Sequence, residues 1–217
     1  MALAIFDLDN TLLAGDSDHL WGRFLVDREI VDGAEYAAEN ERFYQAYQAG
    51  TLDIHGYLRF ALRPLAQHEP HQLRTWRTQF IDEQIRPIVL AQGRDLVESH
   101  RSRGDTLLII TATNRFLAEP IAALFGIDYV LATDPEIAGE RYTGAITGIP
   151  TFWEGKIRAL EAWLQHSKHR LADSYFYSDS HNDIPLLECV RHPIVVDPDP
   201  ALRQQAIRRG WPIISLR

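Results

Sequence analysis

Short apolar runs alternate with amphipathic segments in the second half of the chain, and this alternation restricts the choice of fold. Apolar runs of strand length occupy residues 105–110, 129–132, 174–178, 193–196 and 212–215. Helical spacing of apolar residues is found between and beside them, at residues 88–102, 116–125, 154–165, 183–190 and 201–209. Strands that alternate with helices form βαβ units with parallel strands. The pattern therefore predicts an α/β fold with a doubly wound parallel sheet.

The N-terminal half supplies one more strand and a long helical segment behind it. Residues 2–6 are apolar and lead into the polar Asp7, which is typical of a buried strand that ends at a site. From residue 16 to residue 84, apolar residues recur at helical spacing and predict about three or four helices. The residue before Pro87 is expected to leave the helical region. We therefore predict a core of residues 1–15 and 87–217 with a helical cap of residues 16–86.

A hairpin and the overall composition complete this picture. Residue 137 and residues 142–146 flank the turn signal Gly139-Glu140, which predicts a β-hairpin. The formal net charge is −8, which argues against a nucleic-acid surface because phosphate backbones attract clustered Lys and Arg. The longest apolar runs fall far below the roughly 20 residues needed to cross a bilayer. We expect neither a nucleic-acid nor a membrane partner, and the sequence indicates no oligomeric state.

The single cysteine bears on both compartment and packing. Cys189 has no second cysteine with which to form an internal disulfide, and no signal-like segment opens the chain. We therefore expect a cytoplasmic protein. Because Cys189 follows Leu186 and Leu187 on a predicted helix, we also expect it in the core.

Polar clusters occur where several predicted strands end. They comprise residues 7–11 (Asp-Leu-Asp-Asn-Thr), residues 111–114 (Thr-Ala-Thr-Asn), Lys156 at the head of a helix, and residues 178–183 (Ser-Asp-Ser-His-Asn-Asp). Ligands of open α/β sheets bind beyond the carboxyl ends of the strands, so these clusters should converge. Converging carboxylates repel one another unless a cation joins them, and Mg²⁺ prefers oxygen ligands. The clusters predict a magnesium site.

In this order, the four clusters resemble the motifs of the haloacid dehalogenase superfamily of phosphatases. The resemblance is to subfamily IB, the phosphoserine-phosphatase-like branch, whose helical cap follows the first strand. It spans nearly the whole chain, and its most specific part is Asp-x-Asp-x-Thr at residues 7–11. It implies a Rossmann-like core and a Mg²⁺-dependent phosphomonoester hydrolase that acts on a small-molecule phosphate ester.

The resemblance also implies two catalytic carboxylates. Asp7 would attack phosphorus and form an aspartyl-phosphate, while Asp9 would protonate the leaving alcohol and later activate water. The spacing agrees, because residues two apart in an extended segment point to the same side. Read without the resemblance, Asp9 and Thr11 could cap a turn.

Further roles follow from the matching positions. The implied metal residues are Asp7, Asp9 through its backbone carbonyl, and Asp179, with Asp183 supporting the metal waters or Lys156. The catalytic and phosphate-binding partners would be Thr111 and Lys156, since both can stabilise charge on phosphoryl oxygens. Asn182 is a candidate contact to phosphate or substrate. Taken alone, Lys156 would be read as a solvated charge, and His181 as a loop residue near the entrance.

The substrate prediction rests on Asp16. Its position matches the acidic residue that meets the substrate amino group in phosphoserine phosphatases, which implies an amine-bearing ester. Two departures weaken a match to phosphoserine: residues 111–113 read Thr-Ala-Thr in place of Ser-Gly-Gly, and the fourth motif lacks its usual glycines. A cap arginine for a substrate carboxylate has only Arg59 and Arg63 as candidates, by location.

Residues 14–17 (Ala-Gly-Asp-Ser) resemble a branch that includes histidinol-phosphate phosphatases. Histidinol phosphate carries an amine and no carboxylate, so it is our first substrate prediction. Alternatives are a phosphoserine phosphatase, a phosphotransferase on the same scaffold, a receiver domain, and a non-catalytic regulatory protein that kept the fold. The intact set of Asp7, Asp9, Thr111, Lys156, Asp179 and Asp183 disfavours the non-catalytic alternative.

Overall fold

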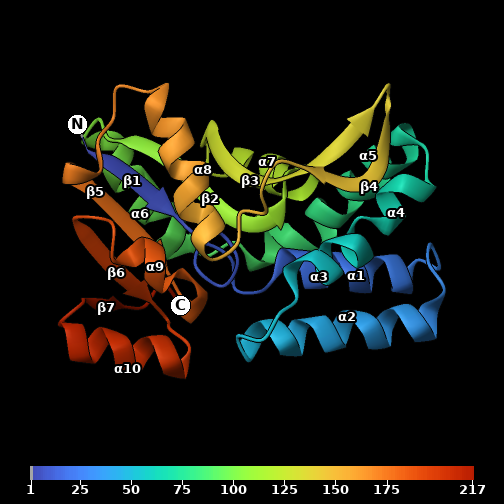
Figure 1. Ribbon diagram of the computed structural model, residues 1–217, viewed down its shortest axis with the longest axis horizontal. Coiled ribbons are helices and arrows are strands. Elements are labelled where there is room, and N and C mark those ends of the chain that lie inside the picture. The colour runs from blue at the N-terminus through green and yellow to red at the C-terminus, as the bar shows by residue number, and fades with distance from the viewer. Residues whose placement is uncertain (1) are drawn as a thin grey trace.

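The computed structural model describes residues 2–217, and a seven-stranded sheet forms its centre (Figure 1). The strands are β1 (Leu3–Phe6), β2 (Thr106–Asn114), β3 (Tyr129–Ala138), β4 (Arg141–Thr147), β5 (Ser174–Ser178), β6 (His192–Val196) and β7 (Ile213–Ile214). Their order is β4-β3-β2-β1-β5-β6-β7, and every neighbouring pair is parallel except the β3–β4 hairpin. The predicted α/β fold with a doubly wound parallel sheet is confirmed.

Strand β1 is the point from which the sheet grows in both directions. It pairs with β2 on one side and with β5 on the other, so the chain order reverses there. In open α/β sheets, the crevice beyond the carboxyl ends of the strands at such a switch point is where ligands bind. The topology therefore puts the residues that directly follow β1 at the expected ligand site.

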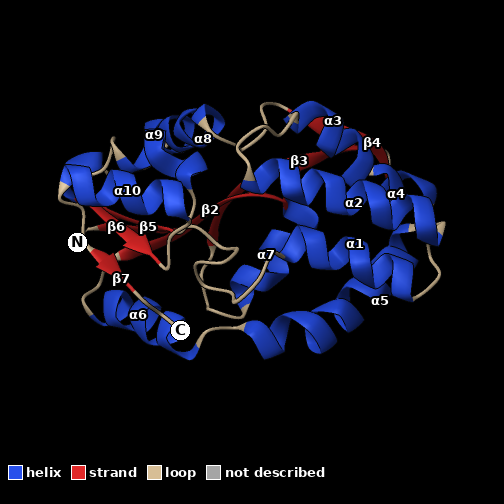
Figure 2. Ribbon diagram, turned by 90° about the horizontal axis from the view of Figure 1, so that it is seen from below, coloured by secondary structure: helices blue, strands red, loops and turns tan. Residues whose placement is uncertain are grey.

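Helices cover both faces of the sheet. Helices α8 (Glu154–Gln165), α9 (Ile184–Leu187) and α10 (Pro200–Arg209) lie on one side of β5 and β6, and α6 (Ala91–Ser102) lies on the other (Figure 2). The side chains of β1 alternate between these layers, as the period of a strand requires. Leu3 and Ile5 pack with α8, α9 and α10, while Ala4 and Phe6 join the larger cluster that includes Val97 of α6.

A helical insertion separates β1 from α6. It contains α1 (Ser17–Asp27), α2 (Gly33–Gln48), α3 (Ile54–Ala61), α4 (Arg63–Gln67) and α5 (Pro70–Phe80), which is more helices than predicted. The extra helix arises because the second residue of α4 is Pro64, and a proline in the first turn favours the start of a new helix. Among residues 2–217, no helix combines the length and apolar composition that crossing a membrane requires.

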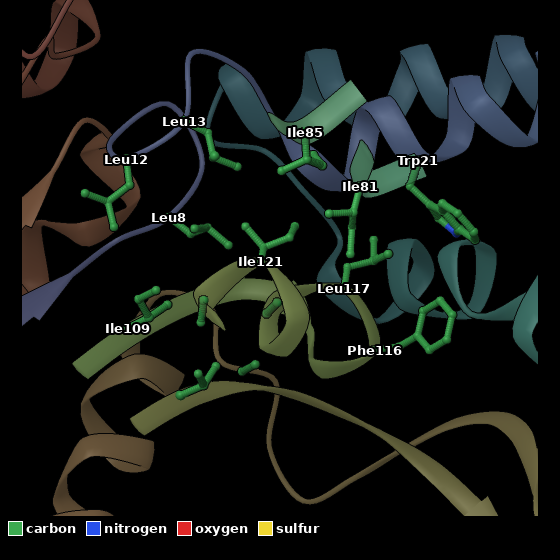
Figure 3. Close-up of a cluster of buried hydrophobic side chains, with 14 of the residues drawn as sticks. Leu8, Leu12, Leu13, Trp21, Ile81, Ile85, Ile109, Phe116, Leu117 and Ile121 are labelled. Carbon is green, nitrogen blue, oxygen red and sulfur yellow. The ribbon is translucent and has the colours of Figure 1, made fainter. Parts of the chain in front are cut away.

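The insertion and the sheet share one apolar cluster. Trp21, Ile81 and Ile85 from the insertion face Phe116 and Leu117 of α7 (Arg115–Ala123), which packs on the sheet (Figure 3). The β3–β4 hairpin makes a second connection, because β4 packs against α3 and α4. The predicted boundaries between core and cap, at residues 15–16 and 86–87, stay a prediction. In the structure, the β3–β4 hairpin of the core segment contacts the cap.

Some predicted boundaries were wrong. The backbone does not leave the helical region before Pro87: a π-helical turn at Ile81–Ile85 and a 3₁₀ turn at Arg86–Ile88 follow α5, and α6 begins at Ala91. Strand β2 continues to Asn114 and β3 to Ala138, because both keep pairing partners beyond their apolar runs. The helix predicted at 183–190 is a 3₁₀ turn at His181–Asp183 followed by the short α9.

Candidate active site

Asp7 lies at the carboxyl end of β1, in the middle of the sheet. Its N–H donates to the Tyr177 carbonyl of β5 (2.9 Å), so the backbone at this residue is held by the neighbouring strand. Its side chain is buried and accepts a hydrogen bond from Lys156 Nζ to Oδ1 (2.7 Å). Lys156 Nζ also lies 2.7 Å from Asp183 Oδ1, and Ser178 donates to Asp183 Oδ2 (2.6 Å). One buried lysine thus joins two buried carboxylates.

The turn before α8 determines where Lys156 lies. Trp153 has φ 49° and ψ −123°, a conformation that favours glycine. A Cβ on Gly155 would lie 1.9 Å from the Pro150 carbonyl oxygen, so the close backbone approach requires glycine there. This tight turn brings the first turn of α8 to the sheet and aims Lys156 at Asp7.

The hydroxyl of Thr11 lies close to both the Asp7 and the Asp179 carboxylates. Thr11 Oγ1 lies 3.4 Å from Asp7 Oδ2 and 3.2 Å from Asp179 Oδ1, and it accepts the N–H of Asp179 (3.1 Å). Burial raises the pKa of Asp7 to about 7 in spite of Lys156. Burial and the charges of Asp7 and Asp183 also hold the pKa of Asp179 well above its usual range. This corner of the site carries more negative charge than Lys156 neutralises.

A magnesium ion fits the chemistry of this corner. Within residues 2–217, no group of three or more His, Cys, Asp or Glu side chains is arranged to hold a metal ion by itself. Mg²⁺ is commonly held by one or two carboxylates with several waters retained, and Asp7 and Asp179, which both lie near the Thr11 hydroxyl, supply two. The Asp183 carboxylate is already engaged by Lys156 and Ser178, which suits a supporting role rather than direct metal contact.

The Asp9 side chain is held by residues of α1 and β2. Its Oδ1 accepts the Ser17 N–H (2.7 Å) and its Oδ2 accepts the Thr113 hydroxyl (2.6 Å). Burial raises the pKa of Asp9 to about 6, the charge of Asp16 adds to the rise, and the two hydrogen bonds oppose it. A carboxyl group of this kind can carry a proton near neutral pH, as a general acid must.

A pocket opens over Asp7 and Asp9. Aromatic and aliphatic residues of the cap form much of its wall: Phe43, Tyr44, Tyr47, Leu52, Ile54 and Tyr57. Thr111 lies at the opposite side with Ala112 and Thr113 of β2. The pocket is thus enclosed between the insertion and the carboxyl end of the sheet.

The pocket is acidic beyond the two catalytic candidates. Asp16 and Asp18, at the start of α1, also line it. Asp16 caps α1 by accepting the His19 N–H (2.8 Å), and burial raises its pKa to about 6. Within residues 2–217, no lysine or arginine lines this pocket. Burial lowers the pKa of His19 and so disfavours a positive charge on its ring.

Several predicted residues lie outside this pocket. The Asn182 amide donates to Ser180 Oγ (3.2 Å) and to the Tyr47 carbonyl (3.4 Å), so it joins the core to the cap. Its contact to phosphate or substrate stays a prediction. Arg59 and Arg63 line a separate surface depression. Neither is among the pocket's lining residues, and within residues 2–217 no arginine of the cap lines the pocket.

Two remaining predictions have clear outcomes. His181 does lie at the junction of cap and core: its Nδ1 is 2.9 Å from Asp199 Oδ2, and a Cβ added to Gly50 would lie 2.5 Å from its Nε2. The prediction that Cys189 is a core residue was wrong, because its side chain is exposed. Leu186 and Leu187 take the buried positions of that short helix instead.

The sequence analysis did not single out Asp18 or its contact with Asn114, although Asn114 belongs to the polar cluster at residues 111–114. Asn114 Nδ2 donates to Asp18 Oδ1 (2.9 Å), although the two residues are far apart in the chain. An acidic residue in the first turn of a helix commonly interacts with the helix dipole, so Asp18 gave no separate signal. Its spacing of two from Asp16 is the one sequence feature that could have drawn attention to it.

Comparison with known proteins shows the family of the chain. A model of the haloacid dehalogenase-like hydrolases matches residues 4–188. The chain is 44% identical to a protein of Neisseria meningitidis named histidinol-phosphatase, over 99% of both chains. It is 44% identical to a crystal structure of a protein of unknown function from Bordetella pertussis, which covers 100% of this chain and 99% of that one with a TM-score of 0.94.

A more distant solved structure shares the fold. It is titled a phospho-aspartyl intermediate analogue of phosphoserine phosphatase, is 18% identical, covers 100% of this chain and 93% of that one, and has a TM-score of 0.73. The family match covers most of the chain and includes the loop after β1, the end of β2, the head of α8 and the loop after β5. The chain therefore belongs to the haloacid dehalogenase-like hydrolase family and is one of its phosphatases.

Proposed function

We propose that this phosphatase works through an aspartyl-phosphate formed on Asp7. The observation that carries the proposal is the position of Asp7 at the switch point of the sheet, with Lys156 at 2.7 Å and the pocket above it. Attack of an Asp7 oxygen on phosphorus would break the bond to the ester oxygen. Asp9, on the same pocket wall, would give its proton to the leaving alkoxide.

The second half of the reaction uses the same residues. A water molecule would attack phosphorus of the aspartyl-phosphate and give a proton to the Asp9 carboxylate. The bond between phosphorus and the Asp7 oxygen would break, which releases inorganic phosphate and restores the Asp7 carboxylate and the protonated Asp9 carboxyl group. Thr111 and Lys156 would bind the phosphoryl oxygens during both steps, because a hydroxyl and a cation stabilise the charge that develops on them.

Mg²⁺ is the proposed cofactor, held by Asp7, Asp179 and the Asp9 carbonyl, with Asp183 orienting Lys156. When bound, it would neutralise negative charge on the phosphoryl group and on the carboxylates around it. Binding can be tested apart from catalysis by thermal unfolding with and without MgCl₂. We expect Mg²⁺ to raise the Tm of the wild type and to have less effect on Asp179→Asn, since a ligand that binds only the folded state stabilises it. An equal shift in both proteins would contradict this assignment.

The substrate we propose is histidinol phosphate. Asp16 lines the pocket and can pair with an amine, whereas no lysine or arginine among the pocket's described lining residues is available for a carboxylate. An amine-bearing ester without a carboxylate suits these charges, because a carboxylate in an acidic pocket would be repelled. The Neisseria relative named histidinol-phosphatase, 44% identical over nearly its whole length, supports the same substrate.

A comparison of two esters tests the proposal. Purified protein with Mg²⁺ should hydrolyse histidinol phosphate with a higher kcat/KM than phosphoserine, and Asp7→Asn should abolish the hydrolysis of both. Faster hydrolysis of phosphoserine would overturn the substrate, and an active Asp7→Asn variant would overturn the mechanism. Product analysis with an added alcohol would show whether the phosphoryl group passes to an acceptor other than water.

A further inference from the structure

The pocket continues past Asp16 to a second carboxylate. Asp18 lines the same pocket as Asp7 and Asp9, with the Tyr57 hydroxyl beside it. Tyr44 and Phe43 form further parts of this wall, and the His19 ring is stacked on Tyr44 with ring centroids 4.3 Å apart. An acidic group among aromatic walls suits a flat ligand group that carries an N–H donor.

The orientation of Asp18 is fixed in a way that leaves another group unsatisfied. Asn114 Nδ2 donates to Asp18 Oδ1 (2.9 Å). Within residues 2–217, the Oδ1 of the same amide is the buried side-chain polar atom without a hydrogen-bond partner. The opposite orientation of the amide would set its oxygen against the carboxylate. Buried polar groups are nearly always paired, and the exceptions gather at functional sites. The Asn114 amide thus donates to Asp18 while its own oxygen stays without a hydrogen-bond partner.

The charge around Asp18 has no balancing cation in the pocket. Burial, together with the charges of Asp16 and Asp9, holds the pKa of Asp18 well above its usual range. Asn114 supplies a neutral donor, and the pocket's described lining residues supply no lysine or arginine. A ligand that brings a positive charge or N–H donors would relieve this repulsion.

We propose that Asp18 binds a second basic group of the substrate, such as an imidazole N–H, while Asp16 binds its amine. This inference rests on the proposed function and adds a specificity-determining residue to it. Its substrate class is a phosphate ester with two basic groups at different distances from phosphorus. Asn114 is then a positioning residue, which acts through Asp18.

Three esters separate the two acidic residues. Histidinol phosphate carries an amine and a ring, O-phosphoethanolamine carries only the amine, and 4-nitrophenyl phosphate carries no basic group. For Asp18→Asn we expect KM for histidinol phosphate to rise about tenfold or more, as loss of a charged hydrogen bond does. The loss of kcat/KM with histidinol phosphate should exceed the loss with O-phosphoethanolamine by about the same factor. For Asp16→Asn the losses with these two esters should be similar.

A matched control and a binding measurement complete the test. Asp27→Asn removes one charge from the exposed end of the same helix and should change none of these ratios. Calorimetry with histidinol, which needs no turnover, should show weaker binding to Asp18→Asn than to wild type. Asn114→Leu, which removes the donor and the unpaired oxygen together, should raise KM for histidinol phosphate more than it lowers kcat.

The outcomes distinguish this inference from the proposed function. If wild-type protein does not hydrolyse histidinol phosphate, the proposed function fails. If it does, and Asp18→Asn lowers the rates with histidinol phosphate and O-phosphoethanolamine equally, or leaves histidinol binding unchanged, the role of Asp18 is overturned alone. If Asp18 served only the helix dipole, Asp18→Asn would lower the Tm and leave the substrate ratios at their wild-type values.

Discussion

At the residue scale, the hydroxyl of Thr113 is the nearest support of the proposed general acid. It donates to Asp9 Oδ2 at 2.6 Å, and the Ser17 N–H holds the other oxygen. We predict that Thr113→Val lowers kcat about tenfold for an alkyl phosphate, whose leaving alkoxide needs a proton. The loss should be smaller for 4-nitrophenyl phosphate, because its leaving group departs without protonation. Steady-state kinetics with both esters checks this.

Thr143→Val is the control for that variant. Thr143 lies on β4 and donates to Glu136, an exposed residue outside the pocket, so its removal should leave both rates near the wild-type value. Equal losses with the two esters in Thr113→Val would mean that the threonine does not act through proton transfer.

The same scale shows what sequence could and could not predict about the site. The approach of Lys156 and Asp7 followed from the convergence of loops at the carboxyl ends of parallel strands, and the structure places these residues 2.7 Å apart. The partnership of Asp18 with Asn114 joins the start of α1 to the end of β2. It depends on how the cap docks on the sheet, which no local pattern encodes. Cys189 is exposed in the turn that follows α9, because that helix ends at Leu187 and not at the predicted residue 190.

At the scale of elements, the turn before α8 positions Lys156, the proposed phosphate-binding residue. A Cβ at residue 155 would lie 1.9 Å from the Pro150 carbonyl oxygen, a backbone atom that cannot rotate aside. We predict that Gly155→Ala lowers the free energy of unfolding by about 3 kcal/mol. It should also lower kcat, because α8 must shift and Lys156 moves with it. Thermal unfolding and kinetics measure the two effects.

Gly33→Ala makes a suitable comparison for Gly155→Ala. Gly33 begins α2, and its added Cβ would meet only Val26, at an ordinary contact distance of 3.8 Å. Stability should change by less than about 1 kcal/mol, and the activity should stay at the wild-type level. If Gly155→Ala behaves like this control, the turn does not constrain α8.

Element boundaries show where sequence rules give way to tertiary contacts. The rule that a residue before proline avoids the helical region predicted a break at Arg86, yet Arg86 has a helical backbone. Ile81 and Ile85 are buried against the sheet side of the cap junction, and this packing outweighs the local preference. The β3–β4 hairpin was predictable from its turn residues, whereas its contact with α4 was not.

At the scale of the whole molecule, a buried histidine joins distant parts of the chain on the face of the sheet that α6 covers. His100 of α6 lies 2.9 Å from Asp105 Oδ2 through Nδ1, and 2.8 Å from the Tyr177 hydroxyl of β5 through Nε2. Asp105 in turn accepts the N–H of Ala2 (2.9 Å), beside β1. Burial lowers the pKa of His100. Burial alone would raise the pKa of Asp105, but its hydrogen bonds hold it below the usual value.

These two directions fix how stability depends on pH. Both groups bind fewer protons in the folded state, so their contribution is complete above their unfolded pKa values, roughly 6.5 for His and 3.9 for Asp. It is lost as the pH falls, first through the His100 range and then through that of Asp105. The aspartates of the pocket, whose pKa values are raised, act in the opposite direction and gain stability as the pH falls.

Comparing the free energies of unfolding of the wild type and His100→Gln separates the effect of His100 from the opposing effect of the pocket aspartates. We predict that His100→Gln lowers the free energy of unfolding at pH 7.5 through lost packing and hydrogen bonds, and that this loss shrinks by pH 5. The reason is that at pH 5 the unfolded wild type binds a proton at His100 more readily than the folded protein does, which lowers its free energy of unfolding. The variant has no such group. Thermal unfolding at several pH values, beside the exposed His71→Gln, measures this, and a difference that does not change with pH would exclude His100 as the source.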